Sequence, residues 1–337
     1  MNFFYVGIDV SKKSMDVAVC KEGVVLKEKH LRVENTEDGF RAMMAWLNKM
    51  AGGCKDELHV CMEHTGIYTL TFQCLLENHQ IAYTLISPLH LKKSLGLVRG
   101  KNDKVDAFRI ADFCYTNRHK LQTSKLPSES LQRLKRLMGE RDRYVNQKRM
   151  LEQTKTDMEA LESTSANART RRMLDGVLSV IEEIEEEMLT LIQSNEALNR
   201  NYTLLTSITG IGLVNAMNTM IYTGNFEAFD NARQYACFVG VAPFPNKSGT
   251  SVKGKTKVSH LGDKHLKADL TQGAKSAAYW DPELRLYYQR KINQGKSYGT
   301  VINAVKFKLI ERMFAVVKRG TPFVKMATFA SKEKINQ

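Results

Sequence analysis

The feature that most constrains this chain is the placement of carboxylates at the ends of apolar segments. Asp9 ends the first apolar segment, and Glu63 ends the apolar run His59–Met62. A carboxylate at the end of a buried strand is costly unless it emerges at an open edge or binds a cation. Asp103 and Asp106 are three residues apart in a segment with helical periodicity, so they share one helix face. This pattern predicts a single acidic site.

The first third of the chain predicts an α/β domain. Closely spaced apolar segments favour antiparallel hairpins, and strands separated by helices favour parallel pairing. The expected strands are Phe3–Val10, Met15–Cys20, Val24–Val33, Leu58–Met62 and Ile81–Ile86, and the expected helices are Thr36–Met50, Ile67–Asn78 and Asp103–Arg118. The acids then lie on strand one, strand four and a later helix, which is the layout of a ribonuclease-H-like (RuvC-like) fold.

Phosphodiester chemistry explains why such a site uses carboxylates. Transfer of a phosphodiester requires charge neutralisation on the non-bridging oxygens, which two Mg²⁺ ions about 3.5–4 Å apart can provide. Mg²⁺ prefers hard oxygen ligands, and without a cation four neighbouring carboxylates would repel one another. We therefore expect a catalytic, metal-binding tetrad with Mg²⁺ as cofactor and Mn²⁺ as an alternative, formed by Asp9, Glu63, Asp103 and Asp106.

Each acid also has an ordinary structural explanation when it is taken alone. Asp is common in turns after strands, and Asp103 could cap its helix. Asp16, Glu77 and Asp112 stand in similar local contexts. The combined order of the four acids is what favours the metal site.

Charge and composition narrow the class of partner. Lys and Arg number 50 against 36 Asp and Glu, a formal net charge of +14, which favours binding to a polyanion such as nucleic acid.

No apolar run reaches the roughly 18 residues of a membrane span, and the N-terminus resembles a strand rather than a signal peptide. The six cysteines form no C-x-x-C pair or zinc spacing, and most are expected to be buried thiols of a cytoplasmic protein.

The middle of the chain predicts two long helices, Ser128–Glu162 and Arg169–Asn195, with a turn near Asn167. They would form an antiparallel hairpin or coiled coil that builds an oligomer, clamps nucleic acid or serves as a spacer.

The last part, from about Tyr202, is expected to be mainly helical. The segment ITGIG resembles a helix-hairpin-helix, in which Gly210 and Gly212 would let backbone N–H groups approach a phosphate, although a plain glycine turn fits as well. A long polar loop is expected over Pro243–Lys257. Its candidate nucleic-acid contacts are Lys247, Lys253, Lys255 and Lys257.

Three motifs resemble one known family. GIDVSKKSMDVAV at 7–19, MEHTGIY at 62–68 and KNDKVDAFRIADF at 101–113 are similar to the N-terminal motifs of the DEDD transposases. These are insertion-sequence transposases with a RuvC-like domain, related to the pilin-gene invertase and to bridge-RNA-guided recombinases. The resemblance implies that the four acids are the metal-binding tetrad. Asn102 departs from the Thr that is common in the family.

The segment Ala242–Leu270 resembles the C-terminal signature of the same family, which carries a nucleophilic serine. The matching residue is Ser248, with Ser251 as the second candidate. By itself a Ser-Gly pair in a polar loop is usually a turn. The resemblance therefore implies a covalent phosphoserine intermediate, and whether Ser248 meets the acids within one chain or between chains stays open.

The resemblance implies a DNA transposase or recombinase of an insertion sequence. Its expected partners are donor and target DNA, a structured guide RNA and further copies of the chain in a dimer or tetramer. The protein is not expected to bind a membrane. It is expected to lie at the nucleoid in the bacterial cytoplasm. The expected domains are a RuvC-like catalytic domain (1–122), a helical coiled-coil section (123–200), a C-terminal domain with the serine loop (201–325) and a tail (326–337).

Two other classes of function remain as alternatives. A RuvC-like endonuclease or junction resolvase would use metal-activated water and would not need Ser248. A non-catalytic nucleic-acid-binding protein would need neither the serine nor the acids. A kinase of the actin-like fold is disfavoured, because the second half lacks further glycine-rich phosphate loops.

Overall fold

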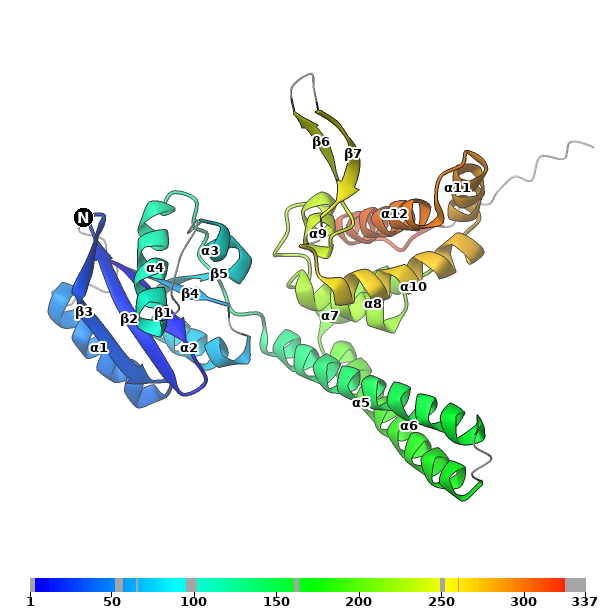
Figure 1. The fold of residues 1–337 in the computed structure, drawn as a ribbon, viewed down its shortest axis with the longest axis horizontal. Coiled ribbons are helices and arrows are strands. Elements are labelled where there is room, and N and C mark those ends of the chain that lie inside the picture. The colour runs from blue at the N-terminus through cyan, green and yellow to red at the C-terminus, as the bar shows by residue number, and fades with distance from the viewer. Residues whose placement is uncertain are drawn as a thin grey trace, which may run out of the picture. The chain divides into compact units, whose positions relative to one another are not determined.

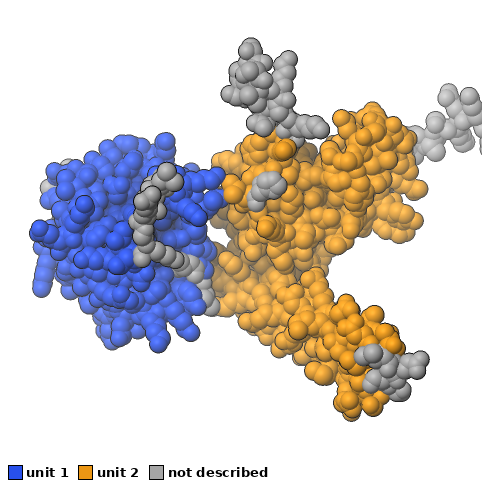
Figure 2. Space-filling model, viewed as in Figure 1, with its two compact units in different colours: residues 1–126 blue, residues 127–337 orange. Residues whose placement is uncertain are grey.

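A computed structural model describes residues 4–51, 57–64, 66–94, 102–160, 164–248, 252–259 and 261–324. The chain divides into two compact units, Met1–Leu126 and Pro127–Gln337 (Figure 2).

Unit 1 is built on a mixed five-stranded sheet in the order β3-β2-β1-β4-β5 (Figure 1). β1 pairs antiparallel with β2, β2 pairs antiparallel with β3, and β4 runs parallel to both β1 and β5. The strands are β1 Phe4–Val10, β2 Ser14–Lys21, β3 Val24–Glu34, β4 Leu58–Glu63 and β5 Ala82–Ile86. The helices are α1 Glu37–Ala51, α2 Ile67–Asn78, α3 Pro88–Ser94 and α4 Asp103–Thr116. The expected α/β domain is confirmed, and α3 is an additional short helix that begins at a proline.

The two faces of this sheet have different roles. Because side chains alternate along a strand, Phe4, Val6 and Ile8 of β1 point to one face, where they pack in the main core with side chains from α1 and α2. Alternate residues of the central strands point to the other face, which α4 covers. There Ala18 and Cys20 of β2 form a small cluster with α4.

Gly7 of β1 sets how closely α4 approaches this face. A Cβ atom added at Gly7 would overlap the backbone of Ala107 and of Ala111. Ala107 and Ala111 are themselves fully buried. Small residues on both sides therefore let the helix backbone lie directly on the strand, next to the end of β1 that carries Asp9.

Unit 2 begins with two long helices, α5 Glu129–Ala160 and α6 Thr164–Gln193, which lie side by side (Figure 1). Ion pairs Arg133–Glu187 at 2.7 Å and Arg141–Glu185 at 2.6 Å show that the helices run antiparallel. The turn expected near Asn167 is wrong, because Asn167 lies inside α6. The Ala and Arg residues around Asn167 favour helix and outweigh the weak helix propensity of Asn.

The rest of unit 2 is mainly helical, as expected. It consists of α7 Glu196–Thr206, α8 Leu213–Tyr222, α9 Ala232–Val239, α10 Lys264–Trp280, α11 Pro282–Asn293 and α12 Tyr298–Arg319. These helices share one hydrophobic core with the bases of α5 and α6.

The long polar loop expected over Pro243–Lys257 is wrong. The structure has two antiparallel strands, β6 Pro243–Ser248 and β7 Val252–Val258, which project from the helices as a β-arm (Figure 1). The lysines and serines of the segment suggested a loop, but such residues are also tolerated in an exposed two-stranded ribbon.

Within the part of the chain that the structure describes, no helix combines the length and apolar character needed to cross a bilayer.

We predict that Gly7→Ala will destabilise unit 1. Overpacking of a close contact typically costs about 1–3 kcal/mol, and here the added methyl meets backbone that cannot rotate away. Urea denaturation should therefore show a lower free energy of unfolding. The matched control is Gly139→Ala in α5, where nothing lies within 4 Å of the added Cβ and the better helix propensity of Ala should stabilise slightly. Equal stability of wild type and Gly7→Ala would contradict the close packing of α4 on β1.

Candidate functional site

Asp9 and Glu63 lie at the same edge of the sheet. β1 and β4 are adjacent parallel strands, and Ile8 is in register with Met62. Asp9 and Glu63 are the next residues on their strands, and Glu63 is the last residue of β4. Both carboxylates therefore come from neighbouring positions on the face that α4 covers.

The start of α4 contributes the other two acids. Asn102 is the N-cap of this helix, and its side-chain oxygen accepts a hydrogen bond of 3.0 Å from the backbone N–H of Lys104. The alternative in which Asp103 caps the helix is therefore wrong. Because Asn102 satisfies the orphan N–H, the carboxylate of Asp103 is not needed as a cap. Asp103 is exposed and Asp106 half-buried.

The electrostatics of Asp9 show that the four acids interact. The pKa of Asp9 is raised to about 6, first by burial and then by the negative charges of Asp103, Asp106 and Glu63. A smaller contribution comes from Asp16. Residues from β1, β4 and α4 thus bring negative charges into one neighbourhood, and a divalent cation would relieve the repulsion between them.

Arg109 is a member of this neighbourhood that the sequence analysis did not single out. Its guanidinium lies 2.7 Å from a carboxylate oxygen of Asp106, one turn earlier on α4. Both side chains are mostly buried, with 18% and 22% exposed. The spacing of three residues on one helix was the available signal. Arg109 therefore offsets part of the negative charge of the cluster.

The three acids in similar sequence contexts have other surroundings. Asp16 is buried on β2 and pairs with the His30 ring at 2.7 Å. Glu77 accepts a hydrogen bond of 2.9 Å from the Tyr83 hydroxyl. Asp112 lies further along α4, where its charge adds to the effect of burial in raising the pKa of Cys20. Of the three, only Asp16 contributes to the pKa of Asp9, and it contributes least.

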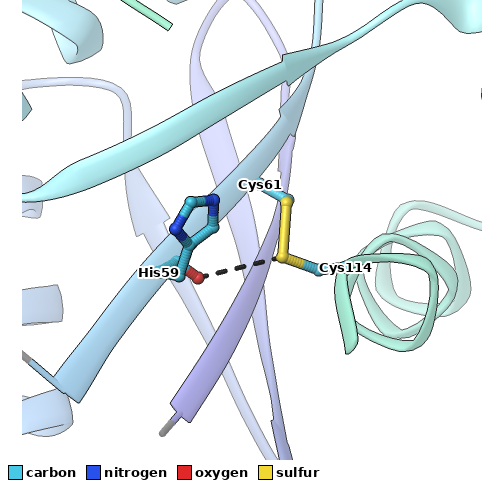
Figure 3. Close-up of side chains that lie close together, drawn as sticks. All are labelled: His59, Cys61 and Cys114. Carbon is cyan, nitrogen blue, oxygen red and sulfur yellow. Dashed lines mark hydrogen bonds between the residues drawn. A yellow bond between two sulfur atoms is a disulfide. The ribbon is translucent and has the colours of Figure 1, made fainter. Parts of the chain in front are cut away.

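A second cluster lies on the same face of the sheet, and Figure 3 shows its three side chains, His59, Cys61 and Cys114. Cys61 of β4 and Cys114 of α4 form a disulfide, so the expectation that these cysteines are thiols is wrong for this pair. They are 53 residues apart in sequence, so their pairing could not be read from spacing. Cys61 precedes Glu63 by two residues, and the cross-link therefore fastens α4 to the strand that carries an acid.

His59 completes this second cluster. Its ligand atom and the two sulfurs lie within 4.8 Å of one another, the only such group of three or more metal-ligating side chains among the described residues. The four acids are therefore spread more widely than this cluster. Burial lowers the pKa of His59. Its Nε2 lies 2.9 Å from the Thr84 hydroxyl, which donates its own proton to the carbonyl of Gln122. His59 Nε2 therefore donates to Thr84.

The candidate serine lies in unit 2. Ser248 is the last residue of β6 and is in register with Val252 of β7, at the outer end of the β-arm. Lys247 is in register with Lys253, and Lys255 and Lys257 follow on β7, with Lys257 exposed. Ser251 lies outside the described residues.

The ITGIG segment forms the turn between α7 and α8. Gly210 has φ +94°, and a Cβ there would overlap the carbonyl oxygen of Gly273 on α10, so this glycine is required for packing. Gly212 is the N-cap of α8, has no side-chain cap and has nothing within 4 Å of its Cβ position. A hollow of about 390 Å³ borders the turn, lined by residues 206–212 and Ser276. The turn that leads into α8, up to its N-cap Gly212, therefore borders an open hollow.

Two family models match this chain. Residues 6–162 match a model described as a transposase, and residues 202–289 match a model described as the transposase IS116/IS110/IS902 family.

Several known proteins resemble the chain. The pilin gene-inverting protein of Moraxella bovis is 26% identical over 329 residues, which is 96% of this chain and 99% of that protein. The insertion element IS110 uncharacterized 43.6 kDa protein of Streptomyces coelicolor is 30% identical over 118 residues, 35% of this chain and 29% of that protein. The transposase for insertion sequence element IS1111A of Coxiella burnetii is 26% identical over 219 residues, 57% of this chain and 58% of that protein.

We predict that Asp9→Asn will stabilise the metal-free protein at pH 7. The folded-state pKa of Asp9 lies above its ordinary value of 3.8, so its contribution to stability is fully present below pH 3.8 and is lost as the pH rises through about 6. Removing the charge should raise the free energy of unfolding at pH 7 by about 1–3 kcal/mol, with little difference near pH 4. Urea denaturation in a chelator measures this.

The same pair of proteins tests the cation site. Added Mg²⁺ or Mn²⁺ should stabilise the wild type and should stabilise Asp9→Asn much less, because a ligand stabilises only the state that binds it. The idea of a strained acidic site would be abandoned if Asp9→Asn proved less stable than wild type at pH 7 without metal.

Proposed function

Because this chain belongs to the IS110 family of insertion-sequence transposases, we propose that its acidic site and Ser248 act together in DNA strand exchange. The family makes the chain a DNA transposase or recombinase. The observation that carries the proposal is the convergence of three other carboxylates on Asp9, whose charges add to the larger effect of burial in raising its pKa to about 6. A DNA recombinase has a direct use for such a site, because its substrate brings further negative charge.

We assign unit 1 to the ribonuclease-H-like, or RuvC-like, class. The support is the strand order, with three antiparallel strands followed by two parallel ones, and acids on β1, β4 and α4. The catalytic domain would then occupy residues 1–122, the helical section 123–200 and the serine-bearing domain 201–325.

The donor set fits a divalent cation. Asp9, Glu63, Asp103 and Asp106 offer hard oxygen donors, which suit Mg²⁺ or Mn²⁺. The pKa of Asp9 lies below neutral pH, so its carboxylate is mostly ionised there and available as a ligand. A bound divalent ion would neutralise charge on the phosphate and activate the attacking oxygen.

Ser248 is the proposed nucleophile. Its hydroxyl oxygen would form a bond to the DNA phosphorus as the bond from phosphorus to the deoxyribose oxygen breaks. The serine loses its proton, and the departing sugar oxygen gains one. The resulting phosphoserine keeps the energy of the broken bond for rejoining. A serine hydroxyl needs activation for this step, and the cation and the lysines of the β-arm are the proposed source.

Nucleic-acid contacts are proposed for the β-arm and the turn before α8. Lysines on both strands of the arm would meet phosphates, namely Lys247, Lys253, Lys255 and Lys257. Gly210 and Gly212 would let the first turn of α8 approach a phosphate, and Gly212 is the better placed because its Cβ position is open. DNA together with a structured guide RNA, in an assembly of two or four copies, is proposed from the family. The net charge of +14 supports a nucleic-acid partner and does not distinguish RNA from DNA.

We predict that Ser248→Ala and Asp106→Asn will each reduce strand exchange by more than about a thousandfold, because loss of a nucleophile or of its activating site removes the chemical step. The assay pairs recombination of element ends with denaturing gels that detect a protein–DNA adduct. The adduct should form with wild type and with Ser251→Ala, but with neither of the first two variants.

Strand exchange by Ser248→Ala would overturn the serine mechanism. Cleavage without rejoining by that variant would instead favour an endonuclease that uses metal-activated water. Activity that survives Asp106→Asn would remove the acidic site from the chemistry.

A further inference from the structure

Beyond the arm and the α8 turn, we propose that a third surface of unit 2 binds unpaired nucleotides by stacking. We call it the α11 surface: the end of α10, α11 and the start of α12, with Tyr279, Trp280, Arg285, Leu286 and Tyr298 as its exposed members. The inference rests on the proposed function as a nucleic-acid enzyme and adds a site to it.

The first observation is the exposure of large apolar side chains. Trp280 is 69% exposed, Tyr279 62%, Leu286 57% and Tyr298 51%. The Tyr279 and Trp280 rings pack edge to face with centroids 4.6 Å apart, so they form one continuous aromatic surface. Aromatic groups gain most of their stabilisation from burial, so a cluster left open to water marks a binding surface.

The second observation is that cations lie against these aromatic rings. Arg285 lies 5.9 Å from the Tyr279 ring centroid. Around Tyr287, the distances to the ring centroid are 5.8 Å for Arg290, 6.0 Å for Lys291 and 5.0 Å for Lys308. Cations therefore lie against rings both at the end of α10 and on α11, with Arg285 and Tyr287 on different sides of α11 because residues two apart on a helix do not face the same way.

The third observation is that nearby acids do not cancel this charge. Residues 279–308 contain six Lys and Arg, of which five are at least partly exposed and Lys306 is buried, but only two acids, Asp281 and Glu283. Both acids bind Arg312, at 2.9 Å and 2.7 Å. Asp281 also caps α11 by accepting from the N–H of Leu284. Arg312 thus pairs with both acids, and the net charge of the surface stays positive.

This combination matches an unpaired strand of RNA or DNA. Such a strand offers flat base faces to aromatic rings and phosphates to cations at short intervals. A duplex buries its base faces in its own stack and would meet only the cations. A strand exchange reaction opens duplexes, and RNA and DNA strands share the chemistry that this surface would recognise.

The chain allows a direct spectroscopic test. It has two tryptophans, Trp46 and Trp280, so Trp46→Phe leaves Trp280 as the single reporter in the full-length protein. The titrants are a 20-nucleotide oligo-U RNA, a 20-nucleotide oligo-dT DNA and a 20-base-pair duplex. We expect saturable quenching of Trp280 by the unpaired strands and little by the duplex. The RNA and DNA titrations show which strand is preferred.

Variants then measure the contribution to affinity. Trp280→Ala should weaken binding of the preferred strand by about fivefold to 100-fold, as expected for one lost stacking interaction, and Trp280→Phe should retain most of the affinity. The matched control is Met150→Ala on α5, a side chain that is 70% exposed but has no aromatic neighbour in the described contacts, and it should bind as wild type does.

Equal affinity of Trp280→Ala and Met150→Ala would overturn the inference, as would equal quenching by the duplex. Quenching by phosphatidylserine-containing vesicles in place of oligonucleotides, or loss of self-association in Trp280→Ala with unchanged oligonucleotide binding, would also overturn it and assign the surface to a membrane or to a second copy. Recombination by Asp106→Asn tests the proposed function separately, so either idea can fail while the other stands.

Discussion

The backbone contact between Gly7 of β1 and Ala107 and Ala111 of α4 is the constraint on which the candidate site depends. Asp9 and Glu63 are placed by strand pairing alone, because β1 and β4 are adjacent and parallel. Strand pairing does not position Asp103 and Asp106, which lie on α4. They reach Asp9 because small residues let the helix lie on the strand without side chains between them. The disulfide from Cys61 to Cys114 fastens the same helix two turns further along.

This packing has an electrostatic cost. It buries Asp9 and brings three other negative charges close to it, and burial followed by these charges raises the pKa of Asp9 to about 6, while Arg109 offsets part of the charge through Asp106. A fold selected for stability alone would separate these carboxylates. Strain of this kind at one edge of a well-packed sheet is typical of a functional site, where stability is lost in favour of binding.

The sequence predicted the elements that depend on local pattern. The apolar segments that form β1 and β2 and the apolar run before Glu63 are local signals, and they led to the sheet and to the acid cluster. Features that depend on the tertiary structure were missed. Cys61 and Cys114 meet only because α4 packs on β4. Arg109 is recognised as part of the site only through its ion pair with Asp106. The composition of the β-arm predicts a loop, because lysine, serine and glycine dominate the segment. Asn167 suggested a turn that neighbouring helix formers override.

The helical hairpin of α5 and α6 has a further consequence. Its buried apolar residues are confined to the base, from Leu131 to Met138 in α5 and from Ile181 to Ile192 in α6. Beyond them, toward Ala160 and Thr164, the described helices contain no buried apolar side chain. The ion pair Arg171–Glu159 at 3.7 Å joins the two helices there, and Lys148–Glu152 and Lys155–Glu159 lie within α5. Amide hydrogen exchange should therefore quicken steadily from base to tip. Paired insertions or deletions near the tip would change the reach of the hairpin and leave the core intact.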